Sequence, residues 1–248
     1  NTEEEALLGV SMTGIMDCSL TNGSKGEEAT AKLLEDLKKA AVLQNKTLAK
    51  KLGINQSTAI TCVKPSGTVS QLTDSASGIH PRFSEYYIRT VRADKKDPLA
   101  TAMISSGFPY EEDVMNNSNW VFSFPQKSPK GSVTVDDLGS IEQLKLWKIY
   151  QDNWCEHKPS MTCYYNDDTF FEVCQWIWKN FDKVSGISFL PQSEHVYRQA
   201  PYQKITKEDY DILTSKFPKG MEWDLEESED NTEGVQTLAC VAGVCELS

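Results

Sequence analysis

The chain has 248 residues, a formal net charge of −11 and 39% apolar residues. This acidity argues against a protein that binds a nucleic acid polymer, because such affinity comes from neutralising phosphates with lysine and arginine. A small anionic ligand such as a nucleotide is still compatible with the charge, since backbone amides and one or two cations can hold it. No apolar run approaches the roughly 20 residues of a membrane-spanning helix, so no membrane association is expected.

The chain opens with Asn1 instead of Met and shows no basic-then-apolar leader. We therefore expect a piece of a longer, cytoplasmic protein. Its seven cysteines have no regular spacing, which fits a reducing compartment better than a disulfide scaffold. Five of them lie in or beside expected helices and strands and are expected to be buried structural thiols: Cys18, Cys62, Cys155, Cys163 and Cys174.

The expected elements alternate between helices and short strands. Apolar residues at helical spacing predict a long helix that stops at Gly53. An Asp-Pro pair at residues 97–98 starts a second helix, and a Ser-x-x-Gln capping box at residues 140–143 starts a third. The prediction is helices over residues 27–52, 97–107, 140–155, 168–181 and 206–217, strands over residues 58–63, 120–124, 160–165 and 185–190, and a loop over residues 125–132.

Strands separated by helices of this length predict parallel β-α-β units and therefore an α/β fold. We expect this folded part to occupy residues 1–218. The remaining residues, 219–248, begin with a stretch that is acidic and poor in apolar residues. Such a stretch cannot bury enough surface to offset its ordering entropy, so a mobile tail is expected there.

The tail ends in two cysteines, Cys240 and Cys245, separated by four residues that include Gly243. The chain can curl at this spacing so that the two sulfurs reach disulfide distance. An exposed dithiol suits thiol–disulfide exchange, because the attacking thiolate must reach its target. A chance pair on a frayed end and half of a zinc site both remain open, although no further zinc ligand is adjacent.

A second candidate is the run K-P-S-G-T-V-S at residues 64–70, directly after an expected strand. A glycine turn with small hydroxyl residues can aim backbone N–H groups at a phosphate. The run is not a Walker A loop, and an ordinary Ser/Gly turn is an equally open interpretation. Two runs rich in His, Arg and Tyr, residues 78–89 and 194–202, are either ligand-lining loops or surface loops.

Several longer motifs occur in a characteristic order. They are I-T-C-V-K-P-S-G-T-V-S at residues 60–70, S-G-I-H-P-R-F-S-E-Y-Y-I-R at 77–89, W-C-E-H-K-P-S-M-T at 154–162, V-S-G-I-S-F-L-P at 184–191 with residues 195–202 after it, and the terminal cysteine pair. Together they resemble the adenosylcobalamin-dependent (class II) ribonucleotide reductases, in particular the monomeric type that reduces ribonucleoside triphosphates. The resemblance spans nearly the whole chain and is weakest at residues 25–56 and 219–234.

The resemblance implies a ten-stranded α/β barrel, of which this chain supplies the C-terminal portion and a flexible redox tail. It also implies adenosylcobalamin as cofactor, whose Co–C homolysis generates a thiyl radical that abstracts the ribose 3′ hydrogen. Two further cysteines then reduce the 2′ carbon and form a disulfide. In this scheme Cys240 and Cys245 reduce that disulfide and are themselves reduced by a thioredoxin-like partner.

The resemblance also assigns residues by motif position. The assigned residues are Ser66, Gly67, Thr68 and Val69 for the substrate phosphates, and Ser75, His80, Pro81, Arg82, Tyr86, Tyr87, His195, Tyr197 and Gln199 for cobalamin. No metal-ligand set is expected.

The chain departs from the family at one essential place. The family's radical cysteine lies in an Asn-x-Cys-x-Glu loop, and no such motif occurs here. We therefore expect that the chain needs the N-terminal part of the reductase and cannot turn over alone. Two other classes of function stay open: a non-catalytic cobalamin- or nucleotide-binding module, and a stand-alone thiol oxidoreductase. The last is weak, because no Cys-x-x-Cys motif begins a helix.

Overall fold

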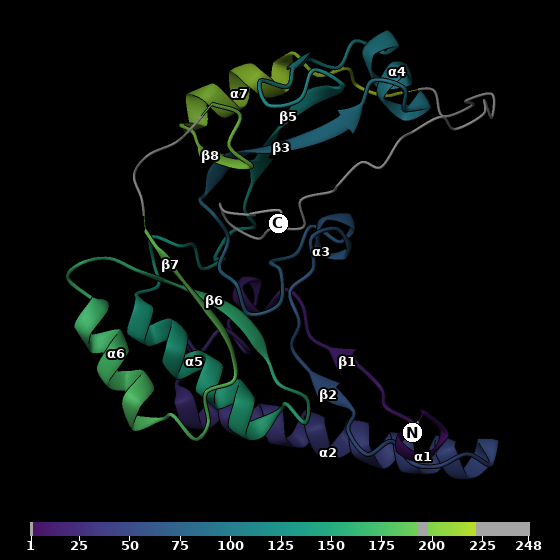
Figure 1. Ribbon diagram of the computed structural model, residues 1–248, viewed down its shortest axis with the longest axis vertical. Helices are drawn as coiled ribbons and strands as arrows, with labels where there is room; N and C mark the ends of the chain where they lie inside the picture. The colour runs from purple at the N-terminus through teal and green to yellow at the C-terminus, as the bar shows by residue number, and fades with distance from the viewer. Residues whose placement is uncertain (1, 193–197, 222–248) are drawn as a thin grey trace. The chain divides into compact units, whose positions relative to one another are not determined.

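The structure is a computed structural model that describes residues 2–192 and 198–221 (Figure 1). The chain divides into two compact units, each built from two stretches of the chain. Unit 1 comprises Asn1–Arg82 and Pro129–Ser193, and unit 2 comprises Phe83–Ser128 and Glu194–Ser248. The division expected between residues 218 and 219 stays a prediction, because most of the tail lies outside the described residues. Among the described residues, no helix has the length and apolar character needed to span a bilayer.

Unit 1 contains two parallel strand pairs, each joined through a helix. Strand β1 pairs in parallel with β2, and β6 pairs in parallel with β7. The β6-α6-β7 unit is one that the sequence predicts, whereas β1 was not among the expected strands. Both units are consistent with an α/β fold. Its elements are α1 (Thr2–Glu5), β1 (Val10–Ser11), the 3₁₀ turn η1 (Ile15–Asp17), α2 (Glu27–Leu52), β2 (Thr61–Cys62), α3 (Val69–Leu72), α5 (Ser140–Asn153), β6 (Ser160–Tyr165), α6 (Phe170–Lys179) and β7 (Gly186–Pro191).

Backbone hydrogen bonds connect the two β-α-β units. The N–H of Ser160, the first residue of β6, donates to the Val63 carbonyl at 3.0 Å. The N–H groups of Glu156 and His157 donate to the Thr61 carbonyl at 2.9 and 3.0 Å. The end of β2 therefore lies beside the start of β6, although these residues are about a hundred positions apart in the chain.

Helix α5 forms the centre of the unit 1 core. Its side chains Leu144, Trp147 and Tyr150 are fully buried and belong to the same cluster as Leu34 of α2 and Met161 of β6. Trp147 also donates its ring N–H to the Pro159 carbonyl at 3.3 Å, so the indole is both packed and hydrogen-bonded. This core supports the loop that follows β2.

Two predictions for unit 1 need correction. Ser140 does not cap α5: Gly139 is the N-cap, and the Ser140 hydroxyl donates instead to the Tyr164 carbonyl of β6 at 2.6 Å. The hydroxyl that the capping-box pattern assigned to the helix end is bonded to a neighbouring strand instead. Cys62, Cys155 and Cys163 are buried as expected, but Cys18 and Cys174 are exposed.

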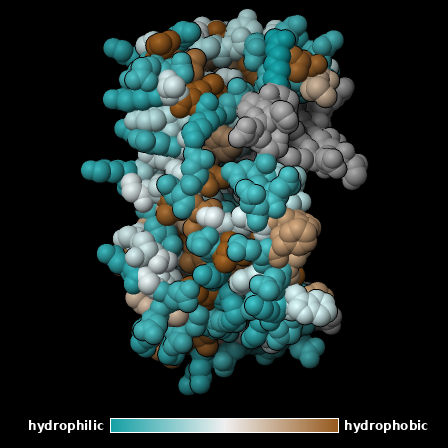
Figure 2. All heavy atoms as spheres, turned by 90° about the vertical axis from the view of Figure 1, so that its left-hand side faces the viewer, coloured by the Kyte–Doolittle hydropathy of each residue, from teal (hydrophilic) through white to brown (hydrophobic). Residues whose placement is uncertain are grey.

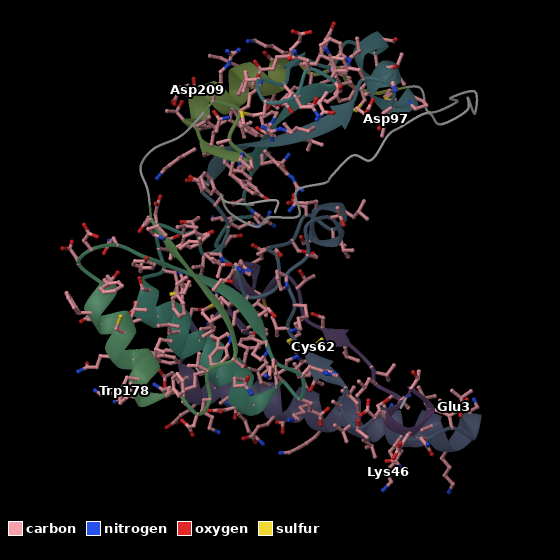
Figure 3. The ribbon with its side chains drawn as sticks, in the orientation of Figure 1. Glu3, Lys46, Cys62, Asp97, Trp178 and Asp209 are labelled. Carbon is pink, nitrogen blue, oxygen red and sulfur yellow. The ribbon has the colours of Figure 1, made fainter. Side chains whose placement is uncertain are left out.

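The outer face of α6 carries exposed aromatic side chains. Phe171 is 79% exposed and Trp178 is 82% exposed, and Figure 3 shows Trp178 directed away from the rest of unit 1. In the space-filling view, hydrophobic residues lie in patches among hydrophilic ones on the side from which α6 is seen (Figure 2). The opposite side of α6 contributes Val173 to the core.

Unit 2 is an antiparallel sheet of strand order β4-β5-β3-β8. The sequence prediction contained only parallel units, and the run at residues 78–89, interpreted as a loop, includes the start of β3. The loop expected at residues 125–132 was wrong for its first three residues, because β5 continues to Lys127. The elements are β3 (Tyr86–Asp94), α4 (Pro98–Ser105), β4 (Tyr110–Glu112), β5 (Asn119–Lys127), β8 (Tyr202–Lys204) and α7 (Lys207–Ser215).

Both helices of unit 2 begin where the sequence indicates. Asp97 caps α4 by accepting the Leu99 N–H at 2.8 Å, with Pro98 at the first helical position. Thr206 and Asp209 form a reciprocal capping box at the start of α7. Figure 3 labels Asp97 and Asp209 at these two helix starts.

Candidate functional site

The candidate phosphate run forms a closed loop between β2 and residue 77. Ser77 closes its base, because the Ser77 hydroxyl accepts the Ser66 N–H at 2.8 Å and donates to the Ser66 carbonyl at 2.9 Å. Ser70 ties the interior, since its N–H donates to the Ser66 hydroxyl at 3.0 Å and its carbonyl accepts the Ser75 N–H at 2.8 Å. Residues 66–77, named here the 66–77 loop, are therefore held together by serine hydrogen bonds.

The tip of the 66–77 loop presents backbone donors at the surface. Thr68 and Val69 are exposed and precede or begin the single turn α3. Within the described residues, neither of their N–H groups donates a hydrogen bond, as is usual for the first residues of a helical turn. The adjoining Lys64 is exposed and donates from Nζ to the Ser160 hydroxyl at 2.8 Å. The loop tip thus offers donors of the kind that hold a phosphate.

Gly78 allows the chain to pass close to the start of the loop. Its φ of +55° lies in the left-handed region, and a Cβ at this position would lie 3.1 Å from the Lys64 carbonyl oxygen. Only glycine meets both requirements without strain. The conformation at Gly78 therefore sets how the loop returns beside the residues from which it departs.

Arg82 is buried and bonded to two carboxylates. Its Nε and Nη2 donate to the two oxygens of Asp17 at 3.0 and 2.9 Å. Its Nη1 and Nη2 donate to the side chain and carbonyl of Asp74 at 3.1 and 2.5 Å. Burial alone would raise the pKa of the Asp17 carboxyl, but hydrogen bonds from Arg82 and the Ala76 N–H and the charge of Arg82 lower the pKa below its usual value.

His80 is buried, and both of its ring nitrogens have protein partners. Nδ1 lies 3.1 Å from the Ser77 carbonyl, and Nε2 accepts the Thr162 N–H at 2.9 Å. The proton therefore belongs on Nδ1, which donates, while Nε2 is unprotonated. Desolvation lowers the pKa of His80, more than the hydrogen bond to Ser77 raises it, so the ring is neutral near pH 7. His80 joins the 66–77 loop to β6.

The other assigned residues of unit 1 are more open. Ser75 and Pro81 are half-buried, and the Ser75 hydroxyl lies 2.7 Å from that of Thr73. Ser75 belongs to the 66–77 loop and Pro81 follows it, and both keep surface that a ligand could touch.

The residues assigned in unit 2 belong to its sheet. Tyr87 is 3% exposed and packs edge-on to Phe83, with ring centroids 6.1 Å apart. Tyr86 is half-buried, and its ring centroid lies 5.3 Å from that of Tyr210.

Gln199 is buried and holds the end of β4. Its side-chain amide donates to the Glu112 carbonyl at 2.7 Å, and its side-chain oxygen accepts the Val114 N–H at 2.9 Å. The Gln199 carbonyl also accepts a hydrogen bond from Arg92, whose guanidinium is paired with the buried Asp113. Its side chain is therefore committed to contacts within unit 2. The remaining assigned residues, His195, Tyr197, Cys240 and Cys245, lie outside the described residues.

Sequence reasoning missed three residues that organise the 66–77 loop: Asp17, Ser77 in its bridging role, and Thr162. Asp17 was passed over because the sequence around it, M-D-C-S, contains no ligand motif. The only signal in the sequence was an isolated acidic residue in an apolar stretch. Nothing in the sequence pairs this residue with Arg82.

The known proteins that are similar to this chain share one description. No family model matches the chain. The adenosylcobalamin-dependent ribonucleoside-triphosphate reductase of Lactobacillus acidophilus is 25% identical over 222 residues, which are 87% of this chain and 30% of that protein. The reductase of the same name from Lactobacillus delbrueckii subsp. bulgaricus is 26% identical, over 97% of this chain and 36% of that protein. A probable reductase of this kind from Dictyostelium discoideum is 32% identical, over 67% of this chain and 22% of that protein.

The fold agrees with the sequence comparison. A crystal structure of a B-12 dependent (class II) ribonucleotide reductase superposes with a TM-score of 0.70 and 26% identity, covering 78% of this chain and 28% of that one. The chain spans between about a fifth and about a third of the length of these curated relatives. In both sequence and fold, the chain is related to the adenosylcobalamin-dependent (class II) ribonucleotide reductases.

Proposed function

We propose that this chain is part of a ribonucleotide reductase that converts ribonucleoside triphosphates to 2′-deoxyribonucleotides for DNA synthesis. The observation that carries the proposal is the similarity to triphosphate reductases over as much as 97% of the chain, together with the shared fold. The chain would contribute the C-terminal portion of the ten-stranded barrel. Its two parallel β-α-β units are the kind of unit from which such a barrel is built.

In this proposal Ser66, Gly67, Thr68 and Val69 bind the phosphates of the substrate. The support is the exposed loop tip, where the Thr68 and Val69 N–H groups have no partner within the described residues. The Ser66 hydroxyl accepts the Ser70 N–H and, among the described residues, donates to no acceptor, so it too can donate to a phosphate oxygen. Lys64 adds a positive charge at the base of the loop.

Adenosylcobalamin is the proposed cofactor, and when bound it supplies the radical that starts the reduction. Within unit 1, Ser75 and Pro81 keep partly exposed surface that a ligand could touch, and so does Tyr86 within unit 2. By contrast, the side chains of His80, Arg82, Tyr87 and Gln199 are engaged within the protein, so they would act by fixing the segments that touch the cofactor. His195 and Tyr197 are proposed as contacts from the family resemblance alone.

Cys240 and Cys245 are proposed as the dithiol that regenerates the enzyme. Reduction of the 2′ carbon replaces its hydroxyl by hydrogen, releases water and oxidises two active-site thiols to a disulfide. The tail dithiol would attack that disulfide, restore the two thiols and become oxidised itself. A thioredoxin-like dithiol would then reduce the tail pair. The Asn-x-Cys-x-Glu loop is absent from this chain, so the N-terminal part of the reductase must supply the radical cysteine.

The double variant Cys240→Ser, Cys245→Ser in the complete reductase tests this role. Thioredoxin-supported turnover should be lost, while a single turnover by the pre-reduced enzyme and cobalamin binding should persist. The matched control is Cys174→Ser, which removes an exposed thiol elsewhere and should leave turnover unchanged. Unchanged multiple turnover by the double variant would exclude the tail dithiol. Binding of cobalamin or nucleotide without any reduction would favour a non-catalytic binding module instead.

A further inference from the structure

Arg82 lies at a junction that connects the 66–77 loop to the N-terminal segment of unit 1. Its side chain is 5% exposed, and its guanidinium makes four hydrogen bonds to Asp17 and Asp74. A planar guanidinium can bind a carboxylate through two parallel hydrogen bonds, as it does at Asp17. Being buried and already neutralised by carboxylates, Arg82 is poorly placed to bind a substrate phosphate directly.

Asp17 extends this junction to the backbone of the loop. Its Oδ2 atom accepts the Ala76 N–H at 2.7 Å in addition to the bond from Arg82. The Ala76 carbonyl accepts the Gly14 N–H at 2.7 Å and the Thr13 hydroxyl at 2.9 Å. The segment of residues 13–17 therefore binds both the N–H and the carbonyl of Ala76.

Asp74 shows that the junction holds the loop in a specific conformation. Its φ is +45°, in the left-handed region that residues other than glycine adopt at a cost. Such a conformation persists where its surroundings hold it, and Arg82 binds Asp74 through both side chain and carbonyl. The Asp74 side chain itself is 68% exposed, so packing contributes little to holding it.

The held end of the loop is coupled to its exposed tip through short hydrogen bonds. Ser75 is bonded to Ser70, and Ser77 is bonded to Ser66. Thr68 and Val69 lie between Ser66 and Ser70, so their N–H groups are fixed by the same set of bonds. A change at Arg82 therefore alters the order of the phosphate-binding donors without touching them.

We propose that Arg82 is a positioning residue, which acts through Asp17 and Asp74 to hold the 66–77 loop in the conformation that binds the substrate phosphates. This inference rests on the proposed function of the loop. A pre-ordered loop loses less conformational entropy when it binds, so loosening it weakens binding. We expect the loop to hold the phosphates equally in the ground and transition states, and the loss of such contacts raises KM and leaves kcat unchanged.

The test is Arg82→Lys in the complete reductase, a change that keeps the charge and removes the bidentate hydrogen bonds to Asp17. We expect KM for the ribonucleoside triphosphate to rise about 10-fold with kcat within about twofold of the parent. Amide hydrogen exchange at Ser66, Ser70 and Ala76 should accelerate, whereas exchange in α5 should not. Asp74→Asn, which removes charge from an exposed side chain, should give a smaller change of the same sign and serves if Arg82→Lys fails to fold.

Leu34→Ala is the control, because it weakens the core of unit 1 at a fully buried site on α2, a helix outside the 66–77 loop. It should lower thermal stability and leave KM unchanged. An unchanged KM in Arg82→Lys, or a loss of kcat alone, would overturn the proposal. If the parent enzyme reduces no triphosphate, the proposed function fails, whereas the exchange measurement still decides whether Arg82 holds the loop.

Discussion

The imidazole of His80 accepts a hydrogen bond at 2.9 Å from the N–H of Thr162, a residue 82 positions later in the chain. Together with the bond between Nδ1 and the Ser77 carbonyl, this contact ties the 66–77 loop to strand β6. The arrangement requires an unprotonated Nε2, so the loop's attachment depends on a neutral ring. Protonation of Nε2 would place an N–H opposite the Thr162 N–H, and the hydrogen bond from Thr162 would be lost.

The first prediction concerns this pH dependence. The pKa of His80 is lowered in the folded chain relative to the unfolded one, so the neutral ring contributes stability that is fully present above the unfolded pKa of about 6.5 and is lost as pH falls below it. The loss is at most about 1.4 kcal/mol per pH unit until the folded pKa is reached. His80→Gln, which cannot titrate, should be less stable at neutral pH but should lose less stability on acidification. Urea unfolding at pH 7 and pH 5.5 gives the loss of unfolding free energy on acidification for the parent and for the variant. Equal losses in the two proteins would contradict this prediction.

The second prediction concerns the close approach at Gly78. Gly78→Ala should lower the free energy of unfolding by about 1–2 kcal/mol for the left-handed backbone alone, and further because the new methyl group meets the Lys64 carbonyl oxygen. Gly53→Ala provides a matched comparison in the same unit, since Gly53 has a φ of +67° but open space around its Cβ position. The difference between the two variants isolates the steric contact. A Gly53 variant as unstable as the Gly78 variant would show that this contact contributes nothing.

The third prediction concerns the reactivity of the cysteines. In a chain carrying Cys240→Ser and Cys245→Ser, Cys18 and Cys174 should react rapidly with a thiol reagent at pH 8, because both are exposed. The buried thiols should react only on unfolding, since burial raises the pKa of Cys155 and of Cys163 to about 12 and the thiolate is the reactive form. Counting fast thiols in native and urea-unfolded protein tests this. Rapid labelling of a third thiol in the native chain would contradict the burial.

The sequence was most informative where local signals decide the structure. Residues 27–52 were predicted as a helix to the residue, because the apolar spacing is regular and Gly53 supplies the left-handed stop. The antiparallel sheet of unit 2 was missed because β3 pairs along its whole length with β5 and also with β8, more than a hundred residues away. No local pattern reveals either partner. Pro125 also suggested a loop, yet β4 pairs with β5 only as far as Phe122, so a proline beyond it removes no bond to that strand.

In the candidate site, too, local signals located the segments but did not reveal their long-range contacts. The motif at residues 64–70 pointed to the loop, and the family resemblance drew attention to His80 and Arg82. Their roles could not be predicted, because Asp17 and Thr162 reach them from 65 and 82 residues away. A buried arginine and a buried histidine each need a partner, but only the folded chain shows which residue it is.

We propose above that this chain belongs to an enzyme that reduces ribonucleoside triphosphates with adenosylcobalamin. The most direct measurement is formation of deoxynucleotide by the complete reductase, given a ribonucleoside triphosphate and a dithiol, with and without adenosylcobalamin. Deoxynucleotide should form only when the cofactor is present, and none should form from the isolated 248-residue chain under either condition. Reduction that proceeds without cobalamin, supported instead by a di-iron partner subunit, would contradict it.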